Sequence, residues 1–425
     1  MSGSSVPSSV LSSFSRQGTL RKFLPRPTFI VTGARTPIGS FLGRLKSVPV
    51  HRLGAIAIDG ALRRAGVEGG QVDQVVVGQV LTAGCGQAPH RQAALASGIP
   101  ASTDVYGVNK VCASGMKALC LAASSVALGH CDTAIAVGME SMSRAPYLLL
   151  KSRHDGHRLG HAEMKDSILY DGLTDPYTSM HMGACTERVI NDMRISRADQ
   201  DAYAVESYKR AAAAWKSGIM DHDGIEPVTV EPTDGAATGA TGVTSPAEVK
   251  EDEEFGRIKL DKVAGLKPSF KRDGTITAAN ASKMGDGAAA ALVMSEEKIF
   301  NLDLQPRARI LSFADAAVDP VNFALAPDIA IRRALGFAGL ETADIYEINE
   351  AFSAVVLANM RLLGLDSSRV NVHGGAVSLG HPLGASGLRI VLSLINALEA
   401  RDARVGCAAV CNGGGGASAI VIERV

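Results

Sequence analysis

Segments without a polar face alternate with segments of helical spacing over residues 29–146. FIVTGARTPIG (Phe29–Gly39) is an apolar strand that runs into a turn, and Leu53–Ala65 has the apolar spacing of a helix. Val72–Leu81 and Asp132–Ser141 are apolar strands. Strands that are apolar on both faces and alternate with helices are typical of an α/β layer that is covered on both sides.

The run VNKVCASGMKALCL (Val108–Leu121) places Cys112 directly before a predicted helix that has almost no polar face and should therefore be buried. A thiol at the start of a buried helix meets unpaired backbone N–H groups and the positive end of the helix dipole. Both favour the thiolate over the thiol. For a lone cysteine, the alternative is a small side chain that only packs in the core.

Residues 147–275 carry more charge and fewer apolar runs, and we interpret them as an inserted loop domain. Ser196–Gly218 begins with a good helix cap and is expected to form a long amphipathic helix. Glu231–Pro246 is low in complexity and is expected to be a mobile surface loop.

The α/β pattern returns at about Arg309 and repeats that of the first half. Such a repeat at long spacing indicates two copies of one α/β unit packed face to face. The predicted halves are residues 29–146, completed by 276–300, and residues 301–425. A site is expected where matching loops converge. The segment that begins at Asp73 corresponds to the segment that begins at Asp344. Val108-Asn109 corresponds to Val370-Asn371 with its Gly387–Leu398 helix, and Asp132–Gly138 corresponds to Val405–Gly413.

Composition narrows the function classes. The 425 residues are 46% hydrophobic and have zero net charge, which gives no indication of a nucleic-acid or membrane partner. Seven cysteines without a C-x-x-C pair indicate individual thiols in a reducing compartment. No apolar run approaches the ~20 residues of a membrane span.

The first 28 residues differ from the rest of the chain. They contain eight serines and four basic residues, whereas the first acidic residue is Asp59. A serine-rich, arginine-containing and acid-free segment is typical of a mitochondrial transit peptide. The alternative is a disordered tail without a targeting role. In both cases we expect residues 1–28 to lie outside the fold.

Four loops carry residues that could take part in catalysis or binding. They are the Cys112 loop, NEAF (Asn349–Phe352), the glycine-rich segment His373–Gly387 around His381, and CNGGGGAS (Cys411–Ser418). Singly, each has an ordinary reading: His381 could be structural, Cys407 and Cys411 could bind a metal, and the glycines could form a turn. Together, a Cys–His pair supplies an activated nucleophile, a second Cys a base, and glycine-rich backbone the N–H donors for an oxyanion.

The motifs VCASGMKA, NEAF, GGAVSLGHPLGASG and CNGGGGAS resemble those of the thiolase family, and within it the acetyl-CoA acetyltransferases, from Phe29 to Val425. The resemblance implies a duplicated, five-layered α-β-α-β-α core with an inserted loop domain. It also implies a reversible ping-pong condensation of two acetyl-CoA to acetoacetyl-CoA plus CoA. A broader-chain 3-ketoacyl-CoA thiolase of β-oxidation is the alternative, although the HMG loop (His181–Gly183) resembles that of short-chain members.

The resemblance also implies roles for the residues. Cys112 corresponds to the nucleophile that carries the acyl group, His381 to the group that activates it, and Cys411 to the base for the second substrate. Asn349, through a held water, would form one oxyanion hole with His381. The backbone N–H groups of Cys112 and Gly413 would form the other.

By the same resemblance, the loop domain binds coenzyme A, and the protein uses no redox cofactor. It also implies a homotetramer (a dimer of dimers) in the mitochondrial matrix, with the cytoplasm as the alternative compartment. Lys259 and His373 depart from the family pattern, as does Phe323-Ala324. The implied coenzyme A contacts are His181, Met182, Tyr208, Arg257, Ile258, Lys262, Phe270, Ser282 and Phe352. A K⁺ ion, which potassium-activated members hold, would lie at Tyr208, Ala278, Ala279, Ala281 and Val377.

Two other classes compete with this interpretation. VTGARTPIG is similar to the nucleotide loop of a dehydrogenase, and Tyr147 and Lys151 have the spacing of a catalytic pair. However, Pro37 stands where that loop needs glycine, and Cys112, His381 and Cys411 would have no role. A non-catalytic coenzyme A-binding member of the fold would be expected to have lost at least one of those three residues.

Overall fold

The computed structural model describes residues 23–150, 153, 156, 159–220, 224–231 and 246–425. Among these residues, ten strands form one sheet in the order β12-β13-β14-β11-β1-β10-β5-β3-β4, with β2 (Gly39–Ser40) beside β10. The main strands are β1 (Thr28–Arg35), β3 (Gln74–Gly78), β4 (Asp104–Val108), β5 (Thr133–Ser141), β10 (Gly285–Ser295), β11 (Ala308–Ala317), β12 (Ile345–Ile348), β13 (Val405–Asn412) and β14 (Gly416–Arg424).

The two halves of this sheet have the same topology. In the first half, β3 is parallel to β5, and β5, β10 and β1 follow in antiparallel pairs. In the second half, β12 is parallel to β13, and β13, β14 and β11 follow in the same way. Within the sheet, the two halves are joined through β1 and β11, where Phe29 pairs with Arg309 and Ile30 with Ala308. The predicted repeat is therefore present in the fold.

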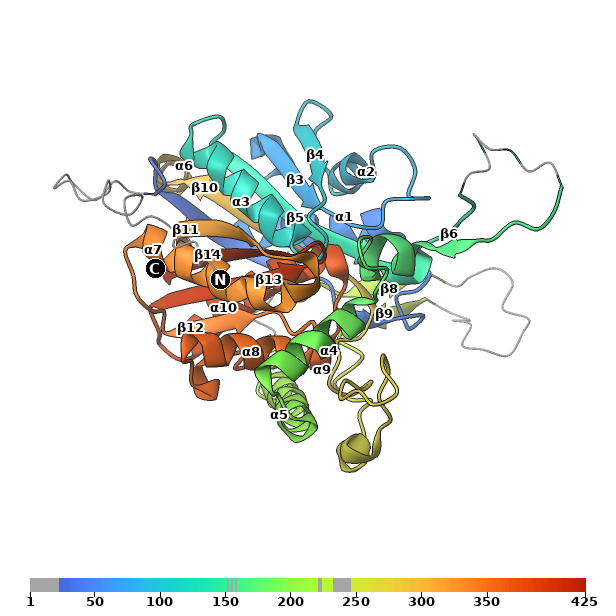
Figure 1. Cartoon of the computed structure of the whole chain (residues 1–425). Helices are drawn as coiled ribbons and strands as arrows, with labels where there is room; N and C mark the ends of the chain where they lie inside the picture. Colours follow the sequence, from blue (N-terminus) through green and yellow to red (C-terminus); the bar gives the residue numbers. More distant parts are fainter. Residues whose placement is uncertain (1–22, 151–152, 154–155, 157–158, 221–223, 232–245) are drawn as a thin grey trace, which may run out of the picture.

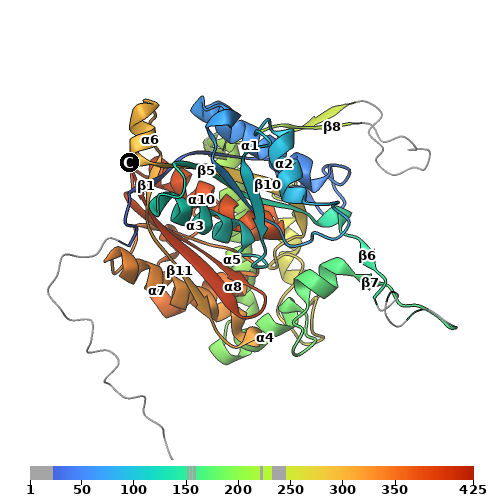
Figure 2. The same ribbon diagram turned by 90° about the horizontal axis from the view of Figure 1, so that it is seen from above.

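Layers of helices alternate with the two half-sheets, which gives five layers in all (Figure 1). α1 (Val50–Ala65) and α2 (Pro89–Ala96) cover the outer face of the first half-sheet, and α7 (Ala326–Ala338) covers the outer face of the second, with α8 (Ser353–Leu363) beside it. α3 (Ser114–Ala127) and α10 (Leu383–Ala400) contact each other and lie between the half-sheets (Figure 2). This is the five-layered α-β-α-β-α arrangement that the resemblance implied.

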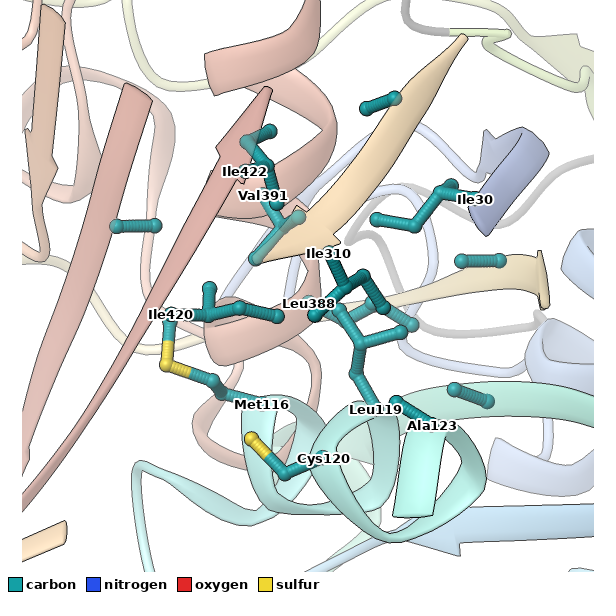
Figure 3. Close-up of a cluster of buried hydrophobic side chains, with 14 of the residues drawn as sticks. Ile30, Met116, Leu119, Cys120, Ala123, Ile310, Leu388, Val391, Ile420 and Ile422 are labelled. Atoms are coloured by element: carbon teal, nitrogen blue, oxygen red, sulfur yellow. The ribbon is translucent and has the colours of Figure 1, made fainter. Parts of the chain in front are cut away.

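The central layer contains the largest apolar cluster. Met116, Leu119 and Ala123 of α3 meet Leu388 and Val391 of α10, and both helices pack on isoleucines from the two half-sheets (Figure 3). α10 is apolar enough along its 18 residues to resemble a membrane span by composition, but 89% of it is buried inside the protein. It is the core helix of the fold.

Residues 147–275 lie largely outside the sheet. They supply α4 (Met182–Met193), α5 (Arg197–Lys216), a π-helical turn at Ile168–Leu173, a 3-10 segment at Leu260–Gly265, and two small two-stranded sheets, β6–β7 (Tyr147–Leu148, Lys165–Asp166) and β8–β9 (Val228–Val230, Ala247–Val249). The predicted helix Ser196–Gly218 is confirmed as α5, with Ser196 accepting a hydrogen bond from the Asp199 N–H as the cap. The β6–β7 arm extends away from the body (Figures 1 and 2).

Two predictions lie mostly outside the described residues. These are the low-complexity loop Glu231–Pro246 and the first 22 residues of the leader segment. The end of that segment was expected to lie outside the fold, but it is part of it. Phe23 and Leu24 pack against the central cluster, Arg26 pairs with Asp132, and Thr28 begins β1.

Most predicted elements are correct to within a few residues. β12 coincides with Ile345–Ile348, and α1, β3, β5 and β13 begin or end up to three residues from their predicted limits. α10 starts at Leu383 rather than at Gly387, because Pro382 can stand directly before the first turn, where its missing N–H is not needed. The remaining helices complete the list: α6 (Glu296–Asn301) and α9 (Ala376–Leu379).

Candidate active site

The loop that carries Cys112 is held in an unusual backbone conformation. Val111 has φ +48°, a left-handed value that a β-branched residue adopts only under strain. The Ser114 hydroxyl accepts from the Lys110 N–H (2.9 Å) and donates to the Val111 carbonyl (2.6 Å). The Lys110 ammonium forms an ion pair with Asp315 of the other half-sheet. These bonds place the Cys112 side chain at the start of α3.

Burial raises the pKa of the Cys112 thiol to about 12. The backbone N–H groups of Gly413 and of Cys112 itself lower the pKa, but they do not outweigh burial. The backbone N–H groups at the helix start therefore act in the predicted direction, toward the thiolate, but desolvation is the larger effect and the resting thiol is protonated. A neighbouring base is needed to activate this thiol.

His381 has a nitrogen that can act as this base. Ser386 donates its only hydroxyl proton to the Pro382 carbonyl (2.9 Å), so the contact between His381 Nδ1 and Ser386 Oγ (2.6 Å) has Nδ1–H as the donor. Nε2 then carries a lone pair, and it is buried without a hydrogen-bond partner among the described residues. Burial lowers the pKa of His381 to about 3, which keeps the imidazole neutral.

Cys411 and Asn349 lie deeper than Cys112. Cys411, at the end of β13, is fully buried; burial raises its pKa, and the charge of an ionised Cys112 raises it further. The two thiols are thus close enough to interact. Asn349 follows β12 and is also buried, and neither polar atom of its amide has a partner in the described part of the chain. A buried amide without partners has its full bonding capacity available to a ligand.

Glycines allow the Cys112 and His381 loops to approach each other. A Cβ on Gly115 would lie 2.6 Å from the Gly384 carbonyl oxygen, one on Gly138 would lie 2.5 Å from the same atom, and one on Gly384 would lie 2.5 Å from the Met139 carbonyl oxygen. Side chains cannot fit at such distances. Here the start of α3, the end of β5 and the start of α10 are in backbone contact, so the two loops have fixed positions relative to each other.

A cavity of about 460 Å³ opens in front of these loops. Cys112, His381 and Gly413 line it together, so the structure brings these three predicted residues to one place. Six of the predicted coenzyme A contacts and two of the predicted K⁺ contacts line it as well: His181, Met182, Arg257, Phe270, Ser282 and Phe352, and Ala278 and Ala281. Cys411, Asn349, Tyr208, Ile258, Lys262, Ala279 and Val377 do not line it.

One wall of the cavity is aromatic. The rings of His181 and Phe270 stack with centroids 4.7 Å apart, and Phe270 meets Phe352 edge-on at 5.9 Å. His181 also caps α4, because its Nδ1 accepts from the Gly183 N–H (3.0 Å). A Cβ on Gly183 would lie 2.4 Å from the Phe270 ring, so glycine is required there. The HMG segment thus holds the aromatic wall in place.

The predicted potassium site contains the side chain of Lys283. Its ammonium donates to the carbonyl oxygens of Ala281 (2.8 Å) and Val377 (3.3 Å), and it lies 5.5 Å from the centre of the Tyr208 ring. Three of the five residues expected to surround K⁺ therefore surround this ammonium. A potassium ion does not fit on the same two oxygens while the ammonium occupies them.

Several residues of this region were not predicted from the sequence. Ser386 lies within the glycine-rich motif His373–Gly387, and Lys283 follows the predicted contact Ser282, but a serine inside a helix and a lysine beside a loop are usually structural or solvated. Glu140 is fully buried and accepts from the N–H groups of Val80 (3.0 Å), Leu81 (3.1 Å) and Gly384 (3.0 Å). Leu169 and Leu173 line the cavity from a turn that has no distinctive pattern. Only the apolar run ending in MES, which places a carboxylate at the end of a buried strand, was a usable signal.

Comparisons with known proteins agree with this geometry. The model of the thiolase N-terminal domain matches residues 28–297, and that of the thiolase C-terminal domain matches residues 304–424. The chain is 48% identical over 412 residues to the mitochondrial acetyl-CoA acetyltransferase of Rattus norvegicus, covering 95% of this chain and 94% of that one. It is 47% identical over 401 residues to the cytosolic acetyl-CoA acetyltransferase of Gibberella zeae, covering 94% and 98%.

Two solved structures have the same fold. A thiolase of Ascaris suum in complex with coenzyme A is 41% identical, with a TM-score of 0.86 over 94% of this chain and 100% of that one. The acetyl-CoA acetyltransferase of Bacillus anthracis is 38% identical, with a TM-score of 0.89 over 95% and 100%. Two family models together span nearly all of the described sheet, and relatives match over most of their length. The chain therefore belongs to the thiolase family, and it is an acyltransferase.

Proposed function

We propose that this protein is an acetyl-CoA C-acetyltransferase, which condenses two acetyl-CoA reversibly to acetoacetyl-CoA and free CoA. The names of the relatives support the substrate. The observation that carries the chemistry is one cavity lined by a protonated thiol, an imidazole with an available Nε2, and a glycine whose N–H faces the thiol sulfur.

In the first half-reaction, His381 Nε2 takes the proton of Cys112 as the sulfur attacks the thioester carbonyl of acetyl-CoA. The carbonyl oxygen becomes negative, and the N–H groups of Cys112 and Gly413 stabilise it. The tetrahedral species collapses, the C–S bond to CoA breaks, and the leaving sulfur receives the proton from His381. The acetyl group is then a thioester on Cys112, and CoA leaves as a thiol.

In the second half-reaction, Cys411 acts as the base. It first gives its own proton to His381 Nε2 and then takes a proton from the methyl carbon of a second acetyl-CoA. The Nε2–H of His381 and a water on Asn349 stabilise the enolate oxygen. The carbanion attacks the acetyl carbon on Cys112, the bond to the Cys112 sulfur breaks, and that sulfur takes the proton back from His381, while the methyl proton stays on Cys411. Each oxyanion needs its own donors, and loss of one such donor typically costs ~3 kcal/mol of barrier.

Coenzyme A is the substrate carrier in this proposal. Its pantetheine arm would pass the aromatic wall of His181, Phe270 and Phe352 and reach Ser282. Arg257 lines the cavity and its side chain is 62% exposed, so its guanidinium can reach a phosphate at the mouth. No step of this mechanism uses a monovalent cation or a redox cofactor.

Intact-mass and peptide mass spectrometry of the protein mixed with acetyl-CoA tests this proposal. The expected result is one acetyl adduct, located on Cys112. Cys112→Ser should lack the rapid adduct and all condensation activity. Cys411→Ala should form the adduct but release no acetoacetyl-CoA.

The matched control is Cys407→Ala. It removes another buried thiol of β13, four residues before Cys411, whose side chain packs in a different apolar cluster. It should keep both half-reactions. An adduct on another cysteine, or full condensation by Cys411→Ala, would contradict the assigned roles.

We also propose a homotetramer in the mitochondrial matrix. The serine-rich, acid-free leader and the mitochondrial relatives support the compartment, although one of the relatives is cytosolic. Large apolar side chains are exposed on the segment around the β6–β7 arm, which supports an assembly that covers them: Tyr147, Leu159, Met164 and Tyr177. Light scattering should give about four times the 44.1 kDa of one chain, and a fluorescent fusion should co-localise with mitochondria.

A further inference from the structure

Lys283 is a half-buried cation in the wall of the cavity. It follows Ser282 in the loop that leads into β10, and its ammonium bonds two carbonyl oxygens from different segments, Ala281 and Val377. The face of the Tyr208 ring lies 5.5 Å away, within the range of a cation–π contact. The carbonyl oxygens of Ala281 and Val377 and the face of the Tyr208 ring form an environment suited to a compact monovalent cation.

The carboxylates nearby favour the charged form of this amine. Burial lowers the pKa of Lys283 to about 8, and Glu254 and Glu350 act in the opposite direction. The side chain is therefore largely protonated at neutral pH. Glu350 is itself held by the Tyr203 and Ser207 hydroxyls, both at 2.8 Å, so its position is fixed.

The ammonium links the two loops that carry site residues. Ala281 stands directly before Ser282, and Val377 lies in α9, which leads to His381. The Lys283 carbonyl accepts from the His381 N–H (2.7 Å), and the Val377 N–H donates to Glu350 (3.0 Å), next to Asn349. A cation on these carbonyls fixes the His381 loop against the Ser282 loop.

We propose that Lys283 is a built-in replacement for the monovalent cation that the family resemblance implied at this place, so that the protein works without potassium. This inference is based on the ammonium of Lys283, which occupies the place where a potassium ion was expected. Lys283 acts as a positioning residue for His381 and Ser282. Its activity readout rests on the proposed function.

The experiment compares wild type, Lys283→Ala and Lys283→Met in choline, sodium and potassium chloride at equal ionic strength. Wild-type condensation activity and melting temperature should be equal in the three salts, with activities within about 1.5-fold. Lys283→Ala removes the amine and opens its position, so activity in choline chloride should fall at least tenfold. Potassium should then restore several-fold more activity than sodium and raise the melting temperature.

Lys283→Met should lose activity without rescue, because its side chain has a similar length and fills the position. The matched control is Lys209→Ala, which removes an exposed lysine next to Tyr208 and should behave as wild type in every salt. The melting series needs no catalysis, so it tests the cation site even if the condensation assay fails and the proposed function is wrong.

Two results would overturn the inference. The first is a wild-type protein that potassium activates or stabilises more than sodium does, because that response requires an ion site despite Lys283. The second is a folded Lys283→Ala protein whose activity and melting temperature do not respond to potassium. The wild-type arm does not depend on whether any variant folds.

Discussion

The hydroxyl of Ser386 determines which nitrogen of His381 carries the proton. Because the Ser386 hydroxyl donates its proton to the Pro382 carbonyl, it can only accept a hydrogen bond from Nδ1–H, and Nε2 is left as the basic nitrogen. With Cys112 protonated at neutral pH, the rate of acyl transfer depends on this tautomer. A histidine with the opposite tautomer would present an N–H to the thiol and could not remove its proton.

We expect Ser386→Ala to lower kcat by about ten- to a hundredfold, because the imidazole loses the group that fixes its tautomer and orientation. The KM for acetyl-CoA should change little, since Ser386 does not line the cavity. Steady-state kinetics measures both. Ser393→Ala, which removes another buried hydroxyl of α10, should keep wild-type kcat. An unchanged kcat in Ser386→Ala would contradict this account.

At the scale of elements, Glu140 joins the ends of three of them. It is the last residue but one of β5, accepts two N–H bonds from the segment after β3, and accepts a third from the first turn of α10. A carboxylate that accepts three N–H groups replaces backbone partners that no strand or helix supplies at this point. It therefore connects the segment after β3 and the first turn of α10, which follows His381, to β5.

Glu140 makes stability depend on pH. Burial raises its pKa from 4.5 to about 7, so between these values the folded protein keeps a proton that the unfolded chain has released. That contribution to stability is complete below pH 4.5 and is lost as pH rises through 7. Between pH 5 and pH 8 the loss is about 2 kcal/mol, at ~1.4 kcal/mol per unit of pKa shift.

Glu140→Gln removes the titration, so the stability difference between wild type and this variant should shrink by about that amount from pH 5 to pH 8. Urea unfolding midpoints of the two proteins at each pH measure it. Other titrating groups are common to both and cancel. A difference that stays constant from pH 5 to pH 8 would mean that Glu140 is ionised in the folded protein throughout this range, which contradicts its raised pKa.

The strands and the long helices were predictable because the spacing of apolar residues along each segment indicates which faces are buried. The four site loops were also predictable, because glycine runs, an NEAF segment, a cysteine before a buried helix and a cysteine at the end of a strand are uncommon together. Ser386, Glu140 and Lys283 were not, since each acts through a partner far away in sequence or through burial. The raised pKa of Cys112 was missed for the same reason: the helix start is local, whereas desolvation comes from the whole surrounding fold.

For the whole molecule, a buried ion pair attaches the segment before the cavity mouth to the sheet. Arg35 of β1 and Asp252 are both almost completely buried and share two hydrogen bonds of 2.8 and 3.0 Å. Asp252 also accepts from the Ile38 N–H (2.7 Å) and the Trp215 indole N–H (3.3 Å). One carboxylate thus connects β1, α5 and the segment that carries Arg257.

Asp252→Ala should destabilise the protein by about 3–5 kcal/mol, because it leaves the charge of the Arg35 guanidinium buried without its counter-charge. Thermal and urea unfolding measure this. Glu251→Ala removes a neighbouring exposed carboxylate and should change stability by less than about 0.5 kcal/mol. Equal stability of the two variants would show that the pair contributes nothing net.

The position of α10 affects how the chain is made. This helix fills the middle layer against both half-sheets, yet it begins only at Leu383, near the end of the chain. During synthesis the N-terminal half leaves the ribosome long before α10 exists, with the apolar face of α3 uncovered. We expect nascent chains of this protein to stay bound to chaperones until the last strands emerge, and a truncation before residue 383 to aggregate rather than fold.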